Sequence, residues 1–316
     1  MFAFLSNEPN DSDDPNDSHG PGELRSWRRA FQGRRACQAF AASAMTAFGA
    51  INAAVSCVGQ LLPPDAFQPG PVTAASVALC VAWGLARARP PSAVRQEFRR
   101  PDMTVVVEVG DLFDQRAHLV VGFSDTFDTA SADGVVINSA SVQGQLLLRH
   151  YDGAVRRLDA ELDAALGSVT PVTREDRDRK PIGKLDRYPI GTVAVLGVRP
   201  QLVFASAYSH LDNQYVAGSN LEDLWFSLNR LWDAVHRHAQ LESVAMPLVG
   251  SGLSRIDYLD QESLLRLILL SFIARSRSGT VCRELRVVVR PADLAKINMA
   301  EVAAFLRTLS SGVGHP

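Results

Sequence analysis

From Met103 onward the chain alternates short β-branched runs with helical segments, and this alternation limits the fold more than any other feature. The strand-like runs, several of them hydrophobic almost throughout, are MTVVVEV, HLVVGF, GVVIN, TVAVLGV, QLVFASA, ESVAMPLV and ELRVVVR. Helices are expected at Asp152–Leu166, Leu221–His238, Gln261–Arg275 and Met299–Leu309, and Ser219 with Glu222 has the spacing of a capping box before the second. Near-continuous strands are usually covered on both faces. We therefore expect a three-layer α/β/α domain with a mixed or mostly parallel sheet over residues 101–316.

Two charge-free runs precede this domain, at residues 36–64 and 66–86. A membrane-spanning helix needs about 20 mostly apolar residues. The first run has that length, and the second has a helix-like segment from Val72. Between them the stretch QLLPPDAFQPGP, with four prolines and a glycine, ends one helix and reverses the chain. Residues 25–100 are thus expected to form a two-helix transmembrane hairpin with arginine-rich flanks.

The arginines around these runs indicate an orientation. The flanking arginines are Arg25, Arg28, Arg29, Arg34 and Arg35 before the pair, and Arg87, Arg89, Arg95, Arg99 and Arg100 after it. The connecting loop has no Lys or Arg, and positive charge marks the cytoplasmic side, so the N-terminus and the α/β domain are expected in the cytoplasm. The alternative is a buried helical hairpin in a soluble domain. The many small residues of the first run favour close helix–helix contact in lipid, and so a homo-oligomer.

The remaining composition excludes several functions. Residues 1–24 are acidic and rich in Asn, Asp, Pro and Gly, which predicts a disordered tail. A formal net charge of −2 gives no basic excess for nucleic-acid binding. The four cysteines lack a C-x-x-C spacing, and His236 with His238 lacks the i, i+4 spacing of a helical metal site. We expect no metal and no cofactor. The mixed-sign stretch REDRDRKPIGKLDRYP is interpreted as a solvated loop.

The stretch MPLVGSGLSRID places a glycine turn at the end of a strand. Ligands of such sheets bind outside the carboxyl ends of the strands. Glycines let the backbone approach a ligand closely, and successive N–H groups form a nest for an anion. The candidate anion-binding residues are Gly250, Ser251, Gly252, Leu253, Ser254 and Arg255. An ordinary glycine turn between strand and helix is the alternative, since G-S-G is not an established phosphate motif.

Polar and aromatic residues follow two other strands. Asp111 and Leu112 come after the first, and Phe123, Ser124, Asp125 and Phe127 follow the next. An aspartate can accept from the exocyclic amine of adenine, and an aromatic ring can stack on a base or sugar. The stretch SVQGQ then places Gln143, Gly144 and Gln145 ahead of a helix, as a second candidate phosphate contact. Taken singly, an aspartate such as Asp125 or Asp128 is more often a turn residue than a ligand contact.

Together the G-D-L motif, the glycine loop before a helix and AMPLVGSGLSR resemble a macro domain, the ADP-ribose-binding α/β/α fold, from about Met103 to the C-terminus. More narrowly, VGFSDTFDT, SVQGQ and RYPIGTVAVL after a pair of membrane segments resemble the membrane-anchored macro effectors (ThsA) of type II Thoeris anti-phage systems. The resemblance implies a protein of the bacterial inner membrane. A partner TIR-domain enzyme would consume NAD to make an ADP-ribose-type signal, with a histidine conjugate as the expected form. The effector would sense that signal, assemble and damage the membrane.

The resemblance also implies roles for residues. It places Asp111 and Leu112 at the adenine, and Phe123, Ser124, Asp125 and Phe127 near a ribose. It places Gly144 and Gln145 at the first phosphate loop and makes residues 250–255 the second. Common macro hydrolases carry N-A-A-N where this chain has G-F-S-D-T-F-D, so the asparagine that holds the distal ribose is absent. This departure favours sensing over catalysis. The alternative is a membrane-tethered ADP-ribosyl hydrolase with Asp125 or Asp128 as its base.

Overall fold

The computed structural model describes residues 92–130, 137–250 and 259–311, together with Met45, Thr46, Phe48, Gly49, Ala53 and residues 76–80. The chain divides into two compact units, Met1–Pro90 and Pro91–Pro316. The described residues of the first unit are helical. Within the described part of the chain, no helix combines the length and the apolar composition needed to cross a bilayer. The predicted acidic tail and nearly all of the predicted hairpin lie outside the described residues, so both stay predictions.

The second unit is built on a mixed eight-stranded sheet, as predicted. Its order is β1-β2-β10-β9-β3-β7-β6, and β8 pairs with β7. The strands are β1 (Ala93–Arg99), β2 (Asp102–Val109), β3 (His118–Ser124), β6 (Val193–Leu196), β7 (Val203–Leu211), β8 (Ala217–Gly218), β9 (Val244–Pro247) and β10 (Glu284–Val289). Strands β2, β10, β9, β3 and β7 run parallel, while β1 and β6 are antiparallel to their neighbours. The carboxyl ends of five parallel strands therefore meet at one edge.

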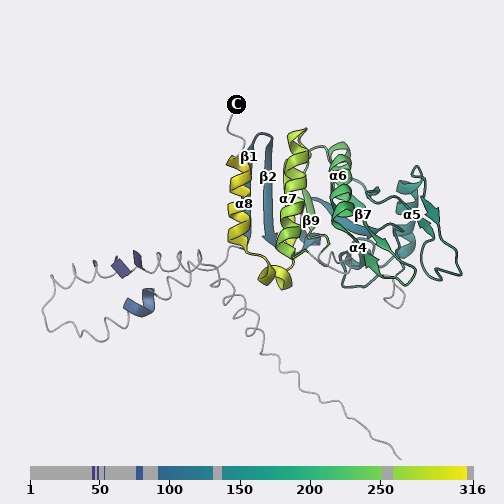
Figure 1. Ribbon diagram of the computed structural model, residues 1–316, viewed down its shortest axis with the longest axis horizontal. Coiled ribbons are helices and arrows are strands. Elements are labelled where there is room, and N and C mark those ends of the chain that lie inside the picture. The colour runs from purple at the N-terminus through teal and green to yellow at the C-terminus, as the bar shows by residue number, and fades with distance from the viewer. Residues whose placement is uncertain are drawn as a thin grey trace, which may run out of the picture. The chain divides into compact units, whose positions relative to one another are not determined.

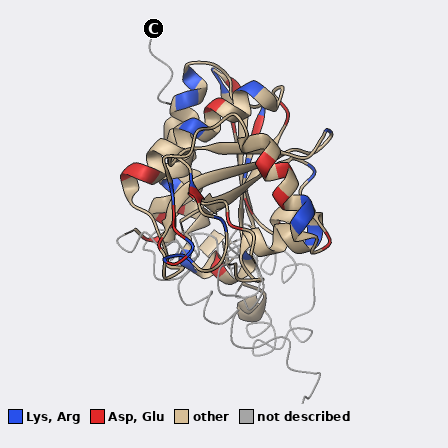
Figure 2. Ribbon diagram, turned by 90° about the vertical axis from the view of Figure 1, so that its right-hand side faces the viewer, with Lys and Arg blue, Asp and Glu red and all other residues tan. Residues whose placement is uncertain are grey.

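Helices cover the sheet in two layers (Figure 1). One face carries α6 (Leu221–His238), α7 (Gln261–Arg277) and α8 (Met299–Ser311), and the other carries α4 (Val142–His150) and α5 (Val155–Leu166). The period-two pattern of β3 explains the division, because Leu119 and Val121 join the core under α4 and α5 while Val120 joins the core under α6 and α7. This confirms the three-layer α/β/α prediction. Among the described residues, basic and acidic residues are interspersed along the helices (Figure 2).

Several local expectations differ from the structure. The sheet begins at Ala93, so β1 precedes the predicted boundary at residue 101, and Arg95, expected to flank a membrane, pairs with Glu284 at 2.8 Å. In GVVIN, residues 134–136 lie outside the described residues, and the remaining two belong to no strand. Helix α6 has the predicted bounds, but its cap is Asn220, whose side chain accepts from the Asp223 N–H. Ser219 donates instead to the carbonyl of Tyr208, so the predicted capping box is wrong.

Candidate ligand-binding site

A cavity of about 460 Å³ lies at the carboxyl edge of the parallel strands. Its walls come from the ends of β3, β7, β9 and β10 and from the start of α4. Side chains and backbone from Gly122, Ser124, Asn138, Ser141, Gln143, Tyr208, Ser209, Leu248, Val249, Gly250, Val289 and Arg290 contribute to the lining. This volume falls in the range of pockets that bury a small-molecule ligand. The edge is also where open α/β sheets bind their ligands.

Among the predicted site residues, Phe123, Ser124, Gln143 and Gly250 line this cavity. Gly250 has a φ of 80°, in the left-handed region that favours glycine, so the strand β9 leaves the sheet by the turn that its sequence predicts. Ser251, Gly252, Leu253, Ser254 and Arg255 lie outside the described residues. The anion-binding role of that loop stays a prediction.

Gly144 and Gln145 lie in the first turn of α4 rather than in a loop ahead of the helix, which corrects the predicted boundary. The Gly144 N–H donates to the side chain of the cap residue Ser141 at 3.0 Å, and the Gln145 side chain donates to the carbonyl of Ser139 at 2.9 Å. A Cβ at Gly144 would lie 2.4 Å from the carbonyl oxygen of Asn138. The glycine therefore allows the cavity-lining loop of residues 138–141 to pack on the helix.

Asp111 and Leu112 follow β2 as predicted, but neither lines the cavity. The Asp111 carboxylate accepts from the Phe113 N–H at 2.8 Å and from Arg149 at 2.5 Å. Partial burial acts to raise the pKa of Asp111, but these two hydrogen bonds outweigh it and hold the pKa below its ordinary value. Leu112 is buried in the core under α4. A base bound by Asp111 would compete with Arg149.

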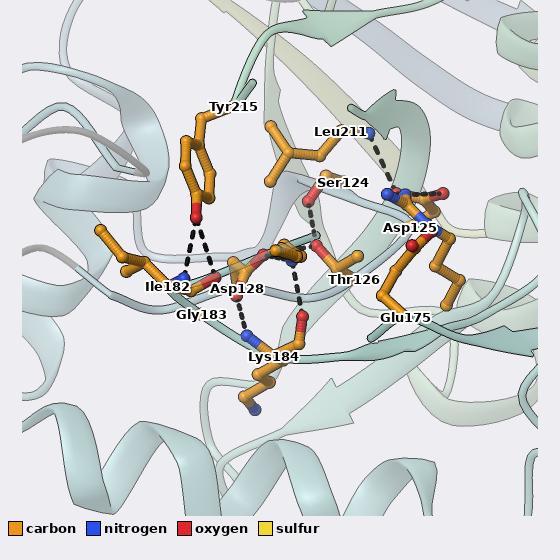
Figure 3. Close-up of polar contacts among 12 residues, drawn as sticks. Ser124, Asp125, Thr126, Asp128, Glu175, Ile182, Gly183, Lys184, Leu211 and Tyr215 are labelled. Atoms are coloured by element: carbon orange, nitrogen blue, oxygen red, sulfur yellow. Dashed lines mark hydrogen bonds and ion pairs between the residues drawn. The ribbon is translucent and has the colours of Figure 1, made fainter. Parts of the chain in front are cut away.

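Asp125 faces the protein interior rather than the cavity. It is 3% exposed, and its carboxylate accepts from Arg187 at 2.9 and 3.1 Å and from the Leu211 N–H at 3.0 Å (Figure 3). Arg187 also donates to Glu175 at 2.6 Å. The predicted ligand contact is therefore an anchor for the segment that carries Arg187.

Asp128 is the second buried anchor. Its carboxylate accepts from Thr126 at 2.7 Å, from the Nζ of Lys180 at 2.5 Å and from the Lys184 N–H (Figure 3). Lys180 has no exposed surface, and its ammonium also donates to the Lys184 carbonyl at 2.6 Å. The interpretation of REDRDRKPIGKLDRYP as a solvated loop is wrong at this point. The segment runs from the end of β4 (Thr173–Arg174) through β5 (Asp186–Arg187), and these contacts hold it against the residues that follow β3.

Phe127 is fully buried, so it cannot stack on a ligand as its position in the sequence suggested. Its ring stacks on Phe123 at 5.6 Å between centroids and meets the edge of Tyr188 at 5.7 Å. Tyr208 of β7 also lines the cavity, and it is more exposed than the buried Phe123. A Cβ at Gly122 would lie 2.3 Å from the ring of Tyr208, so the glycine makes room for it. An isolated glycine inside a strand is the signal that indicates such an approach.

Charged residues after β10 complete the lining, and nothing in the sequence analysis singled them out. Arg290, Asp293 and Lys296 lie in or beside the 3-10 helix η4 (Pro291–Lys296). Burial acts to raise the pKa of Asp293, but hydrogen bonds from Gln261, Lys296 and Arg290 outweigh burial and keep the pKa below its ordinary value. The carboxylate therefore stays ionised between its two cations.

This lowered pKa predicts how Asp293→Asn changes stability with pH. A depressed carboxyl pKa contributes stability above the unfolded-state value, near 3.8, and loses it as the pH falls through the folded-state value. The variant should unfold at lower urea concentration than the wild type at neutral pH. The gap should close as the pH falls below about 4. A constant gap across that range would contradict the assignment.

The architecture, with a cavity at the carboxyl edge of a mixed sheet, is that of an α/β/α domain of the macro type. The family model described as "Thoeris protein ThsA, Macro domain" matches residues 105–290, more than half of the chain. The chain therefore belongs to the Thoeris ThsA macro-domain family.

One curated relative carries the same family name. The Thoeris protein ThsA of Bacillus amyloliquefaciens (strain Y2) is 24% identical over 209 residues, which cover 64% of this chain and 67% of that protein. Similar solved structures include a mutant of the Oceanobacillus iheyensis macrodomain, at 14% identity and a TM-score of 0.45, covering 68% of this chain and 94% of that one. The same macrodomain with ADP has 12% identity and a TM-score of 0.39, with 68% and 97% covered.

Proposed function

We propose that this chain is the effector of a Thoeris anti-phage defence system and that its macro domain senses an ADP-ribose-type signal nucleotide. The observation that carries the proposal is the cavity of about 460 Å³ at the carboxyl edge of the sheet, in a chain of the ThsA macro-domain family. The signal is an amino-acid conjugate of ADP-ribose, with histidine as the expected amino acid. A partner TIR-domain protein makes it from NAD, so that partner acts through the nucleotide.

In the proposed complex the pyrophosphate lies between the two edges of the cavity that carry backbone donors. One is the edge at Gly250, which is the last described residue before the predicted second phosphate loop. The other is the loop before α4, where Asn138, Ser141 and Gln143 line the cavity. Clustered backbone N–H groups and a helix N-terminus favour an anion. Tyr208 offers its ring to the apolar parts of the ligand.

Binding without hydrolysis is supported by the state of the two candidate bases. A general base must reach the proton that it removes or the water that it activates. Asp125 is held by Arg187, and Asp128 is held by Lys180, with both carboxylates buried. Each would have to break an ion pair before it could act. Release of ADP-ribose from an ADP-ribosylated protein by the wild-type chain would favour the hydrolase alternative instead.

The output of the proposed effector is membrane damage by a homo-oligomer. The two charge-free runs within residues 25–100 form the membrane hairpin of this proposal, with the N-terminus and the macro domain at the cytoplasmic face of the inner membrane. For ligand to drive the change, it must bind one assembly state more tightly than another. No nucleic acid takes part.

Liposome leakage tests the proposal. The 316-residue chain is reconstituted into vesicles that hold a fluorescent dye, with the histidine conjugate of ADP-ribose added outside. We expect dye release that requires both protein and conjugate and that saturates with ligand. Adenosine at the same concentration serves as the control. Leakage that is the same without the conjugate would remove the signal-sensing model.

A further inference from the structure

Beside the turn at Gly250 the cavity wall carries a group of charged residues, Arg290, Asp293 and Lys296, called here the Asp293 cluster. All three line the cavity. They follow β10, which pairs with β9 in parallel so that Val288 lies beside Pro247. Arg290 and Val249 each lie two residues after this pair, so they leave the sheet at the same level. The cluster therefore begins beside the turn at Gly250, at the end of the neighbouring strand β10.

A single buried carboxylate organises the cluster. Asp293 is 6% exposed and accepts from the Nε of Arg290 at 2.9 Å, from the Nζ of Lys296 at 3.0 Å and from the side chain of Gln261 at 3.1 Å. The Nη2 of Arg290 lies 2.7 Å from the same carboxylate. Two cations share one anion, so the cluster keeps a formal charge of +1. The buried carboxylate also fixes where the two cationic groups lie.

Both cations keep donors for a ligand. The side chains of Arg290 and Lys296 are 58% and 54% exposed. Among the described residues, the Nη1 of Arg290 makes no hydrogen bond. The Nζ of Lys296 makes one hydrogen bond to these residues, and it carries three protons. The other charged lining residue, Asp128, is neutralised by buried Lys180. The described lining of the cavity thus has a positive side formed by the Asp293 cluster.

We propose that the Asp293 cluster binds a phosphate group of the nucleotide, with Arg290 and Lys296 as direct contacts and Asp293 as the residue that positions them. This inference rests on the proposed function and adds the charge selectivity of the site. Guanidinium and ammonium groups donate charge-assisted hydrogen bonds to phosphate oxygens. The site then binds phosphorylated ligands more tightly than the bare nucleoside. The difference in affinity is larger than backbone N–H donors alone would give.

Calorimetric titration of the 316-residue chain in detergent tests the inference. The variants are Arg290→Gln with Lys296→Gln, and Arg290→Lys alone. Glutamine keeps a donor for Asp293 while removing the charge. The control is Arg283→Gln, which changes an exposed arginine at the opposite, amino-terminal edge of the sheet. The ligands are ADP-ribose, its histidine conjugate, adenosine and inorganic pyrophosphate. Thermal unfolding of each variant confirms that it is folded.

We expect the double variant to raise the Kd for ADP-ribose and for its conjugate by about tenfold or more, with weaker salt dependence. Adenosine binding and the control should be unchanged, and Arg290→Lys should retain most of the affinity. An unchanged Kd for ADP-ribose would overturn the inference while leaving the proposed function in place. A loss confined to the histidine conjugate would also overturn it, because the cluster would then bind the amino-acid carboxylate.

Pyrophosphate binding by the wild-type chain also separates this inference from the proposed function. A wild-type chain that binds pyrophosphate through the cluster but no nucleotide would remove the proposed function and keep only the phosphate contact of the cluster. A wild-type chain that binds neither pyrophosphate nor nucleotide would overturn both.

Discussion

Replacing Lys180 by Met should lower the free energy of unfolding by about 3–5 kcal/mol, because it leaves the Asp128 carboxylate buried without its cation. Lys180 has no exposed surface, and its Nζ lies 2.5 Å from Asp128. The hydrogen bonds from the Thr126 hydroxyl and the Lys184 N–H would remain, but both donors are neutral and cannot replace the positive charge of the lysine. Urea unfolding of the purified variant measures the loss.

Two further variants isolate the ion pair as the cause. Lys180→Met combined with Asp128→Asn should recover more than half of the loss, because the amide is neutral and its oxygen still accepts from the Lys184 N–H. Arg179→Met changes the exposed neighbour and should have little effect. A single Lys180→Met variant as stable as the wild type would show that the segment carrying Lys180 is not fastened by this pair.

Gly144→Ala should destabilise the domain by about 1–3 kcal/mol and weaken nucleotide binding, because the new Cβ has no room. It would meet the carbonyl oxygen of Asn138 at 2.4 Å and the Cα of Ser139 at 2.8 Å. These are backbone atoms, so the loop of residues 138–141 must move. That loop lines the cavity, and its displacement changes the position of Ser141.

The matched control for Gly144→Ala is Gly279→Ala, where the new Cβ would lie 4.0 Å from the nearest side-chain atom, in His236. Thermal unfolding and calorimetric titration with ADP-ribose measure the two effects. Equal affinity and stability for Gly144→Ala and the wild type would contradict the packing of the loop on α4. A loss of stability with unchanged affinity would show that the loop does not contact the ligand.

The sequence predicted the layers of the fold because its hydrophobic pattern is strong there. Helix α6 begins and ends at the predicted residues, Leu221 and His238, since its apolar residues recur at helical spacing and polar residues bound it. Strand β1 was missed because its residues, AVRQEFR, carry two arginines that suit a membrane flank equally well. Its pairing with β2 is non-local and leaves no mark in the strand's own sequence.

The candidate site was predicted less completely, because its polar residues could serve the protein or the ligand. Asp125 and Asp128 lie where a ligand contact was expected, but cations more than 50 residues away in the chain, Arg187 and Lys180, occupy them. A run with charges of both signs gives no signal that one lysine is buried. The Asp293 cluster was missed because its position beside Gly250 also depends on residues distant in the chain, through the pairing of β10 with β9.

The central claim is that the cavity at the carboxyl edge of the sheet binds an ADP-ribose-type nucleotide. Calorimetric titration of the 316-residue chain with ADP-ribose and with its histidine conjugate tests it most directly. We expect saturable binding of one nucleotide per chain, tighter for the conjugate and weakened by Gly144→Ala. No binding of either nucleotide by the folded wild-type chain, or binding that Gly144→Ala and the Asp293-cluster variants leave unchanged, would contradict it.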